Sequence, residues 1–109
     1  MIKNLTPHNV CVVDSNNNIV AEYPSEGIAR ATQSAEHVGE LEGIELVRMT
    51  FGHTENLPAP QADVFLIVSV VTANAAKAEG RSTDDLLITA DPARDENGRI
   101  IGCRKFALV

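Results

Sequence analysis

An unbroken apolar segment followed directly by a helical pattern places the strongest constraint on how this chain folds. Residues Val64–Val68 (VFLIV) are apolar at every position, which is typical of a strand buried on both faces. The alanine-rich segment Val70–Glu79 has a helical pattern, with Ser69 as a suitable N-cap and Gly80 as a suitable stop. A second apolar segment, Leu86–Ala90, follows. This region therefore predicts a strand–helix–strand unit with a right-handed crossover.

Shorter segments on either side of this unit predict further strands. Each alternates or concentrates apolar residues and is bounded by turn residues. These segments are Asn9–Asp14, Ile19–Tyr23, Ile28–Gln33, Ile44–Phe51 and Arg99–Val109. The whole chain, residues 1–109, is expected to form a single α+β domain. It has about seven mostly antiparallel strands, in a compact sheet or a partly closed barrel, and one main helix.

Two regions of the chain depend on turns. Residues 34–43 fit a loop, a short helix or one arm of a wide hairpin, with Glu42-Gly43 as a plausible turn. Near the end of the chain, Asn97-Gly98 predicts a two-residue type I′ turn, because such a turn needs positive φ at both central positions. A turn of this length places Glu96 opposite Arg99.

The charge and composition exclude several classes of partner. Fifteen acidic and nine basic residues give a net charge of −6, and aromatic residues make up only 4%. Nucleic-acid binding favours a basic face and stacking aromatics, and anionic membranes also attract basic surfaces. The longest apolar run is too short for a membrane span, and the first residues, MIKNLTPHN, lack the apolar stretch of a signal peptide. We expect a cytoplasmic protein with no nucleic-acid or membrane partner, in which Cys11 and Cys103 are reduced.

Metal and cofactor sites are not indicated. The three histidines (His8, His37 and His53) are dispersed, and Cys11 and Cys103 lie near opposite ends of the chain. Zinc sites usually contain a close pair of ligands, which this chain lacks. The common glycine-rich phosphate-binding loops are absent as well. We expect no metal and no cofactor.

Seven polar residues are candidates for binding an anionic small molecule: His8, Arg30, Ser69, Asp91, Arg94, Asp95 and Arg104. Ser69 lies where the free amides of a helix start attract anions, and arginines bind phosphate or carboxylate through paired hydrogen bonds. Each candidate also has an ordinary structural role. Ser69 caps the helix, and the imidazole of His8 bonds to the backbone where the chain enters the first strand. The charged cluster after Asp91 forms ion pairs across a solvated hairpin.

The order of several short motifs resembles a family of small uncharacterised proteins from phage and bacterial genomes. The motifs are NLTPH (Asn4–His8), an SxG-then-AR segment (Ser25–Arg30), FG followed by LPxP (Phe51-Gly52 and Leu57–Pro60), IVS (Ile67–Ser69) and DPxRDxxGRIIGCR (Asp91–Arg104). Together they cover nearly the whole chain. The family carries no established activity, so the resemblance implies a compact single domain of phage or mobile-element origin and no particular chemistry.

These observations favour a non-enzymatic binding or accessory module that binds an anionic small molecule. One alternative is a small hydrolase or transferase that uses His8 or Ser69 with Asp91 or Asp95. Such an enzyme requires these side chains to meet within about 3 Å or through one bridging water. The other alternative is a structural subunit whose terminal strand pairs with the edge of another chain, giving a homo-oligomer.

Overall fold

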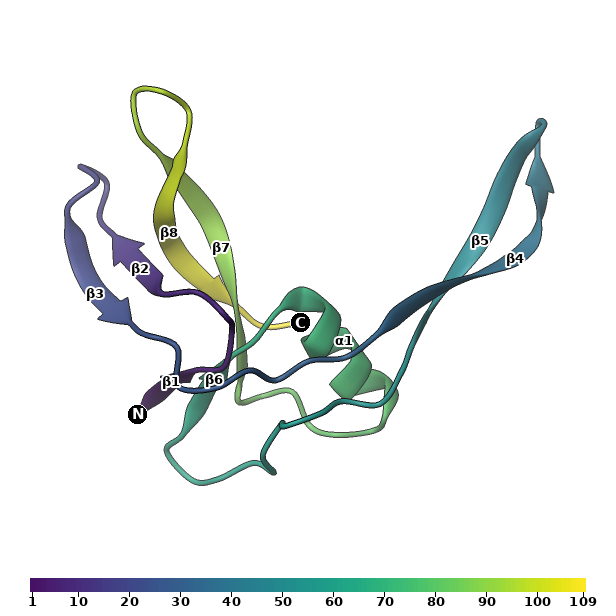
Figure 1. Ribbon diagram of the computed structural model, residues 1–109, viewed down its shortest axis with the longest axis horizontal. Coiled ribbons are helices and arrows are strands. Elements are labelled where there is room, and N and C mark those ends of the chain that lie inside the picture. Colours follow the sequence, from purple (N-terminus) through teal and green to yellow (C-terminus); the bar gives the residue numbers. More distant parts are fainter.

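The computed structural model describes all residues, 1–109, and contains eight strands and one helix (Figure 1). The strands are β1 (Ile2–Asn4), β2 (Val10–Val13), β3 (Ile19–Tyr23), β4 (Gln33–Leu41), β5 (Ile44–Phe51), β6 (Phe65–Ile67), β7 (Leu86–Arg94) and β8 (Ile100–Ala107). The helix is α1 (Val70–Ala78). No helix is long and apolar enough to cross a membrane.

Six strands form one sheet in the order β1-β6-β7-β8-β2-β3. The longer pairings, β7 with β8 and β2 with β3, are antiparallel, whereas β1–β6, β6–β7 and β2–β8 are short parallel pairings. A bridge between Asn4 and Ser25 brings the β3 end of the sheet back to β1. The sheet is thus partly closed, and the α+β class with a partly closed barrel is confirmed.

The strand–helix–strand unit is also confirmed. Strands β6 and β7 are parallel neighbours, and α1 connects them. The Ser69 hydroxyl accepts a hydrogen bond from the Thr72 amide at 3.1 Å, which caps the helix. At the other end, the amides of Gly80 and Arg81 bond to the carbonyls of Lys77 and Ala76. Gly80 has φ of 86°, so this end is a Schellman motif that requires glycine's freedom at positive φ.

The hydrophobic core is small and lies around α1. Its members come from α1, β6, β7 and three segments between the elements: Leu5, Ala29, Leu66, Val68, Ala73, Ala76 and Leu86. Alanines on the helix allow it to approach the sheet closely. Only 14 of 109 residues are buried, and no residue of β4 or β5 is among them.

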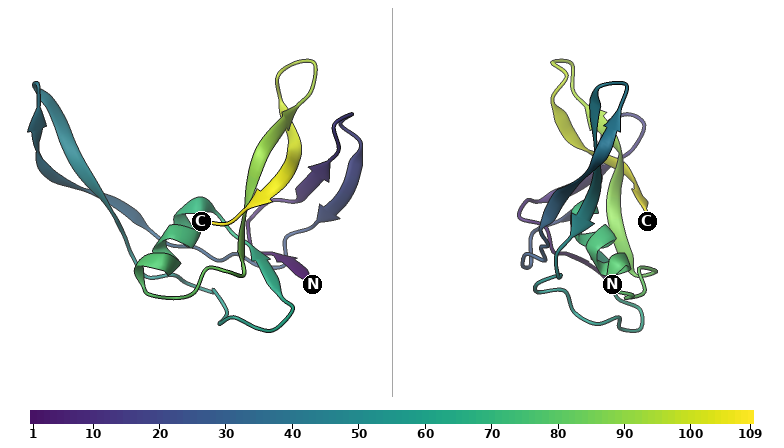
Figure 2. Two further views of the ribbon diagram at one scale, coloured as in Figure 1. Left: turned by 180° about the vertical axis from the view of Figure 1, so that it is seen from behind. Right: turned by 90° about the vertical axis from the view of Figure 1, so that its right-hand side faces the viewer.

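Strands β4 and β5 form a separate two-stranded hairpin, which we call the arm (residues 33–51). The arm extends away on the side of α1 opposite to β7–β8 and β2–β3 (Figures 1 and 2). At its tip, Glu42 and Gly43 have φ of 54° and 79°, as a type I′ turn requires. The open choice for residues 34–43 is therefore resolved in favour of a hairpin, and Glu42-Gly43 is its turn.

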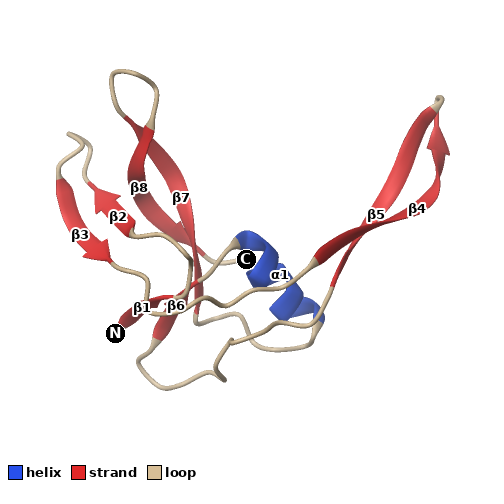
Figure 3. Cartoon of the chain, in the orientation of Figure 1, coloured by secondary structure: helices blue, strands red, loops and turns tan.

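The strand predicted at Ile28–Gln33 is wrong. These residues are mostly loop, and the strand begins only at Gln33 (Figure 3). The Ala29 amide bonds to the Leu5 carbonyl, and Arg30 exchanges two backbone hydrogen bonds with Glu55. Because these partners lie in loops, the segment joins no strand ladder.

The turn between β7 and β8 also differs from the prediction. Only Gly98 has positive φ, and the pair that closes the loop is Asp95 with Arg99, not Glu96 with Arg99. The Asp95 carboxylate accepts hydrogen bonds from the amides of Asn97 (2.9 Å) and Arg99 (3.0 Å). These bonds favour a three-residue loop, a type I turn followed by a glycine at positive φ, over the two-residue type I′ turn.

Candidate functional site

A buried asparagine organises the segment around His8. Asn4 is fully buried, and its amide group donates hydrogen bonds to the carbonyls of His8 (2.7 Å) and Tyr23 (2.8 Å). Its side-chain oxygen accepts bonds from the amide (2.9 Å) and the hydroxyl (2.6 Å) of Thr6. Asn4 therefore holds the bend over residues 5–8. The prediction that the His8 imidazole bonds to backbone is wrong, since the backbone carbonyl of His8 makes these contacts and its side chain is exposed.

Beside this bend, a cleft of about 380 Å³ opens at the start of α1. Its lining includes Thr6, Pro7, Arg30, Ser69 and Thr72. Two of the predicted ligand residues, Arg30 and Ser69, thus share one cleft, and His8 follows directly after Pro7. The Ser69 hydroxyl donates to the Thr72 hydroxyl at 2.9 Å while it caps the helix. The guanidinium of Arg30 makes no hydrogen bond or ion pair within the chain and is available to an external anion.

The other four predicted ligand residues lie on the β7–β8 hairpin, and three of them make hydrogen bonds within the chain. Arg94 donates to the carbonyl of Gly98 at 2.8 Å, and Arg104 donates to the side chain of Asn17. Asp95 holds its own turn, and Asp91 is exposed. No ion pair forms among them, so the predicted cross-strand ion pairs are absent. No hydrogen bond joins either aspartate to His8 or Ser69.

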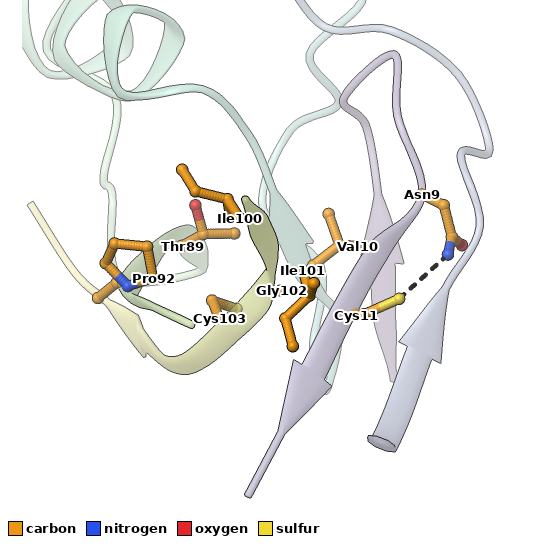
Figure 4. A pocket seen from close by; sticks show the side chains of 10 residues that line it. Asn9, Val10, Cys11, Thr89, Pro92, Ile100, Ile101, Gly102 and Cys103 are labelled. Carbon is orange, nitrogen blue, oxygen red and sulfur yellow. Dashed lines mark hydrogen bonds between the residues drawn. The ribbon is translucent and has the colours of Figure 1, made fainter. Parts of the chain in front are cut away.

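A second cavity, of about 370 Å³, lies between β2 and the β7–β8 hairpin (Figure 4). The ladder pairing of β2 with β8 is limited to Val12 and Cys103. A Cβ atom on Gly102 would lie 2.7 Å from the Cys11 carbonyl oxygen, so this close approach requires glycine. Around this point the two hairpins separate and leave a space lined mainly by apolar side chains, among them Val10, Pro92, Ile100 and Ile101.

Both cysteines beside this cavity are free thiols. Removal from water raises the pKa of the Cys103 thiol above its ordinary value. The pKa of Cys11 is also raised, first by removal from water and then by the hydrogen bond to Glu22. Because the thiolate is the reactive form, these shifts make both cysteines poor nucleophiles at neutral pH.

The arm is the feature with the most exposed apolar surface. Near its tip, Leu41, Ile44 and Leu46 share one face, because Leu41 pairs with Ile44 and side chains alternate along a strand. Leu41 and Ile44 are 63% and 69% exposed. Nearer the body of the protein, by which we mean the six-stranded sheet and α1, Val47 and Met49 are exposed on the opposite face of the arm.

The arm is also acidic. It contains Glu36, Glu40, Glu42 and Glu45 against one arginine, Arg48. Glu40 and Glu45 lie directly opposite each other across the two strands, a like-charge pairing that destabilises an isolated hairpin. The carboxylate of Glu45 contacts His37 Nδ1 at 2.8 Å. The arm therefore exposes both apolar side chains and unpaired negative charge.

Sequence reasoning did not identify the arm as a functional element. The available signal was two segments of similar length, 33–41 and 44–51, on either side of a Glu-Gly pair. The first segment contains Gly39 and several charges, which obscure the strand pattern. Nothing in either segment indicates whether a face will be covered by the rest of the chain.

Comparison with known protein families, with curated proteins and with solved structures finds no match for this chain. The resemblance to a phage and bacterial family therefore stays a prediction. No group of three or more histidine, cysteine, aspartate or glutamate side chains gathers in a way that could hold a metal ion.

Proposed function

We propose that this protein is a non-enzymatic binding module that acts through protein–protein contacts made by its arm. One observation carries the proposal: the 33–51 hairpin exposes apolar side chains on both faces and contributes no residue to the core. The most exposed apolar residues of the arm, Leu41 and Ile44, lie beside its turn, at the point farthest from the body.

The physical argument concerns the stability of the arm. A two-stranded hairpin on its own is at best marginally stable in water, and it becomes stable when a face packs against another surface. Apart from contacts between β5 and α1 near its base, the arm has no such surface within the chain. The radius of gyration is 16.3 Å, against roughly 13 Å for a compact chain of this length. A binding partner supplies the missing surface.

The geometry supports binding over the hydrolase or transferase alternative. The Ser69 hydroxyl caps α1, and the Asp95 carboxylate holds the turn of its own hairpin. A nucleophile needs a base within hydrogen-bond reach, and no such contact reaches Ser69 from His8 or Asp91.

Site-specific photo-crosslinking tests the proposal. A photoreactive residue replaces Ile44 at the arm tip, and a matched variant carries it at Gln61, which is exposed in the loop between β5 and β6. We expect crosslinks to protein from position 44 in living cells, few from position 61, and loss of the position-44 crosslinks when Leu46→Ser is added. Equal crosslinking from both positions, or none from position 44, would refute the proposal.

A second candidate function is the binding of a small anion in the cleft at the start of α1. The observation that favours it is the free guanidinium of Arg30 beside the first turn of the helix, where backbone amides attract negative charge. Titration calorimetry with inorganic phosphate and a panel of nucleotides tests it. Heat that disappears in Arg30→Ala but persists in Arg48→Ala supports this function, and absence of heat in the unmodified protein rejects it.

A further inference from the structure

We infer that the partner of the arm is a second copy of this chain, and that each arm docks its apolar tip into the cavity between β2 and the β7–β8 hairpin of the other copy. The inference rests on the proposed function, because it requires the arm to be a protein-binding element. It adds the identity of the partner, the docking surface and the symmetry.

The apolar surfaces of the arm and the cavity match in character. The tip presents the face formed by Leu41, Ile44 and Leu46. The cavity is lined by Ile100, which is 61% exposed, and by Ile101. Within the chain these two surfaces lie on opposite sides of α1 (Figure 1), so the arm does not cover the cavity of its own chain. A second copy can place its arm there.

Charge complementarity favours the same pairing. The arm carries four glutamates and one arginine. On the β8 side of the cavity, residues 99–107 carry Arg99, Arg104 and Lys105 and no acidic residue, whereas the β7 side carries one carboxylate, Asp91, between the lining residues Ala90 and Pro92. The side chains of Arg99 and Lys105 make no hydrogen bond or ion pair within the chain. Opposite charges on the two surfaces speed encounter and fix the orientation of docking.

The exposed area agrees with an extensive interface. The chain exposes 7177 Å², whereas a compact monomer of 11.7 kDa exposes roughly 5,900 Å². The excess is roughly 1,300 Å² per chain, or about 2,600 Å² for two copies, which lies in the range of permanent assemblies. When two copies exchange their arms reciprocally, both cavities are filled and the assembly closes at two copies. One-way docking leaves one cavity unfilled, unless several copies close into a ring.

A charge-exchange experiment on the full-length chain tests the inference. One variant reverses the arm (Glu40→Lys with Glu42→Lys), and the other reverses the cavity side (Arg99→Glu with Lys105→Glu). Each variant alone places like charges at both contacts and is expected to weaken dimerisation by at least about tenfold. An equal mixture restores opposite charges at both contacts, so a one-to-one heterodimer is expected. Sedimentation and native mass spectrometry measure the assemblies, and circular dichroism confirms that each variant is folded.

Two variants without a change of charge test the apolar contact of the arm separately from its charges. Ile44→Ser is expected to give monomers at concentrations where the unmodified chain is a dimer, whereas Leu108→Ser, at an exposed apolar residue outside both surfaces, leaves the dimer intact. A strictly monomeric unmodified chain overturns the inference, and crosslinks from position 44 to another protein in cells then preserve the proposed function. A larger ring overturns the two-fold closure. A dimer that is insensitive to Ile44→Ser overturns the docking of the arm.

Discussion

Replacement of Asn4 by alanine tests how the body of the protein holds its first loop. Asn4 is fully buried and makes four hydrogen bonds, two as donor and two as acceptor. At about 0.5–1.5 kcal/mol for each bond, the sum reaches at most roughly 6 kcal/mol. The exposed carbonyl of His8 regains water when the amide is lost, so the full sum is not reached. We expect Asn4→Ala to lower the free energy of unfolding by about 2–4 kcal/mol.

Urea denaturation followed by circular dichroism measures this change. The variant is made in an Ile44→Ser background, so that assembly does not contribute to the measured stability. Asn16→Ala is the matched control, because Asn16 is exposed and its side chain makes no hydrogen bond. We expect the control to change stability by less than about 0.5 kcal/mol. If Asn4→Ala is as mild as the control, the bend at residues 5–8 does not depend on the Asn4 side chain, and the reasoning fails.

Three further predictions follow from particular contacts. Gly102→Ala forces a Cβ atom against the Cys11 carbonyl and should lower the free energy of unfolding by about 1–3 kcal/mol, measured in the same way. Ser69→Ala removes the cap of α1 and should lower the free energy of unfolding by about 1 kcal/mol. Ser69→Asp supplies another capping oxygen and should largely retain the stability. Equal losses of stability in the two variants would contradict the capping role of Ser69. The hydrogen bond from the Thr54 amide holds the pKa of Glu79 below its ordinary value of 4.5. The contribution of this contact to stability is therefore fully present above the ordinary pKa of 4.5 and is lost as the pH falls through the lowered pKa of the folded state. The unfolding free energy of Glu79→Gln should therefore depend less on pH in the acid range. An acid-range pH profile that is the same in the variant and the unmodified protein would argue against this contact.

Much of the local structure was predictable because its determinants lie within a few residues of each other. The cap at Ser69, the stop at Gly80 and the turn at Glu42-Gly43 involve bonds or dihedral angles that adjacent residues specify. The apolar run before Ser69 predicted a buried strand, and Leu66 and Ile67 are buried in β6.

Hydrogen bonds that the apolar pattern does not register decided both failed predictions, at long range in the first and within the loop itself in the second. The alternation in Ile28–Gln33 is real, but the backbone of Ala29 and Arg30 bonds to Leu5 and Glu55, which are distant in sequence. The loop at Asn97-Gly98 is lengthened because the Asp95 side chain satisfies two of its amides. Local propensity does not reveal such competition among hydrogen-bond partners.

The candidate sites also combine features that neighbouring residues specify with features that depend on long-range packing. Arg30 was identified as an arginine that can bind an anion, and Ser69 by its place at the predicted start of the helix, but their meeting in one cleft depends on how residues 28–31 pack against α1. The charged residues near Asp95 were predicted as ligand residues; in the structure, Arg94 and Asp95 make hydrogen bonds within their own hairpin, and Arg104 bonds to Asn17.

By itself, the sequence determined the class of fold, the helix with both of its ends, and most of the strands, because periodicity and turn chemistry are properties of neighbouring residues. Only the tertiary structure decided that the 33–51 hairpin lacks a covering surface and that β2 and the β7–β8 hairpin separate around an apolar cavity. The physical reason is that burial results from the packing of the whole chain. An apolar strand such as Ile44–Phe51 has the same sequence whether its faces meet the core, another chain or water.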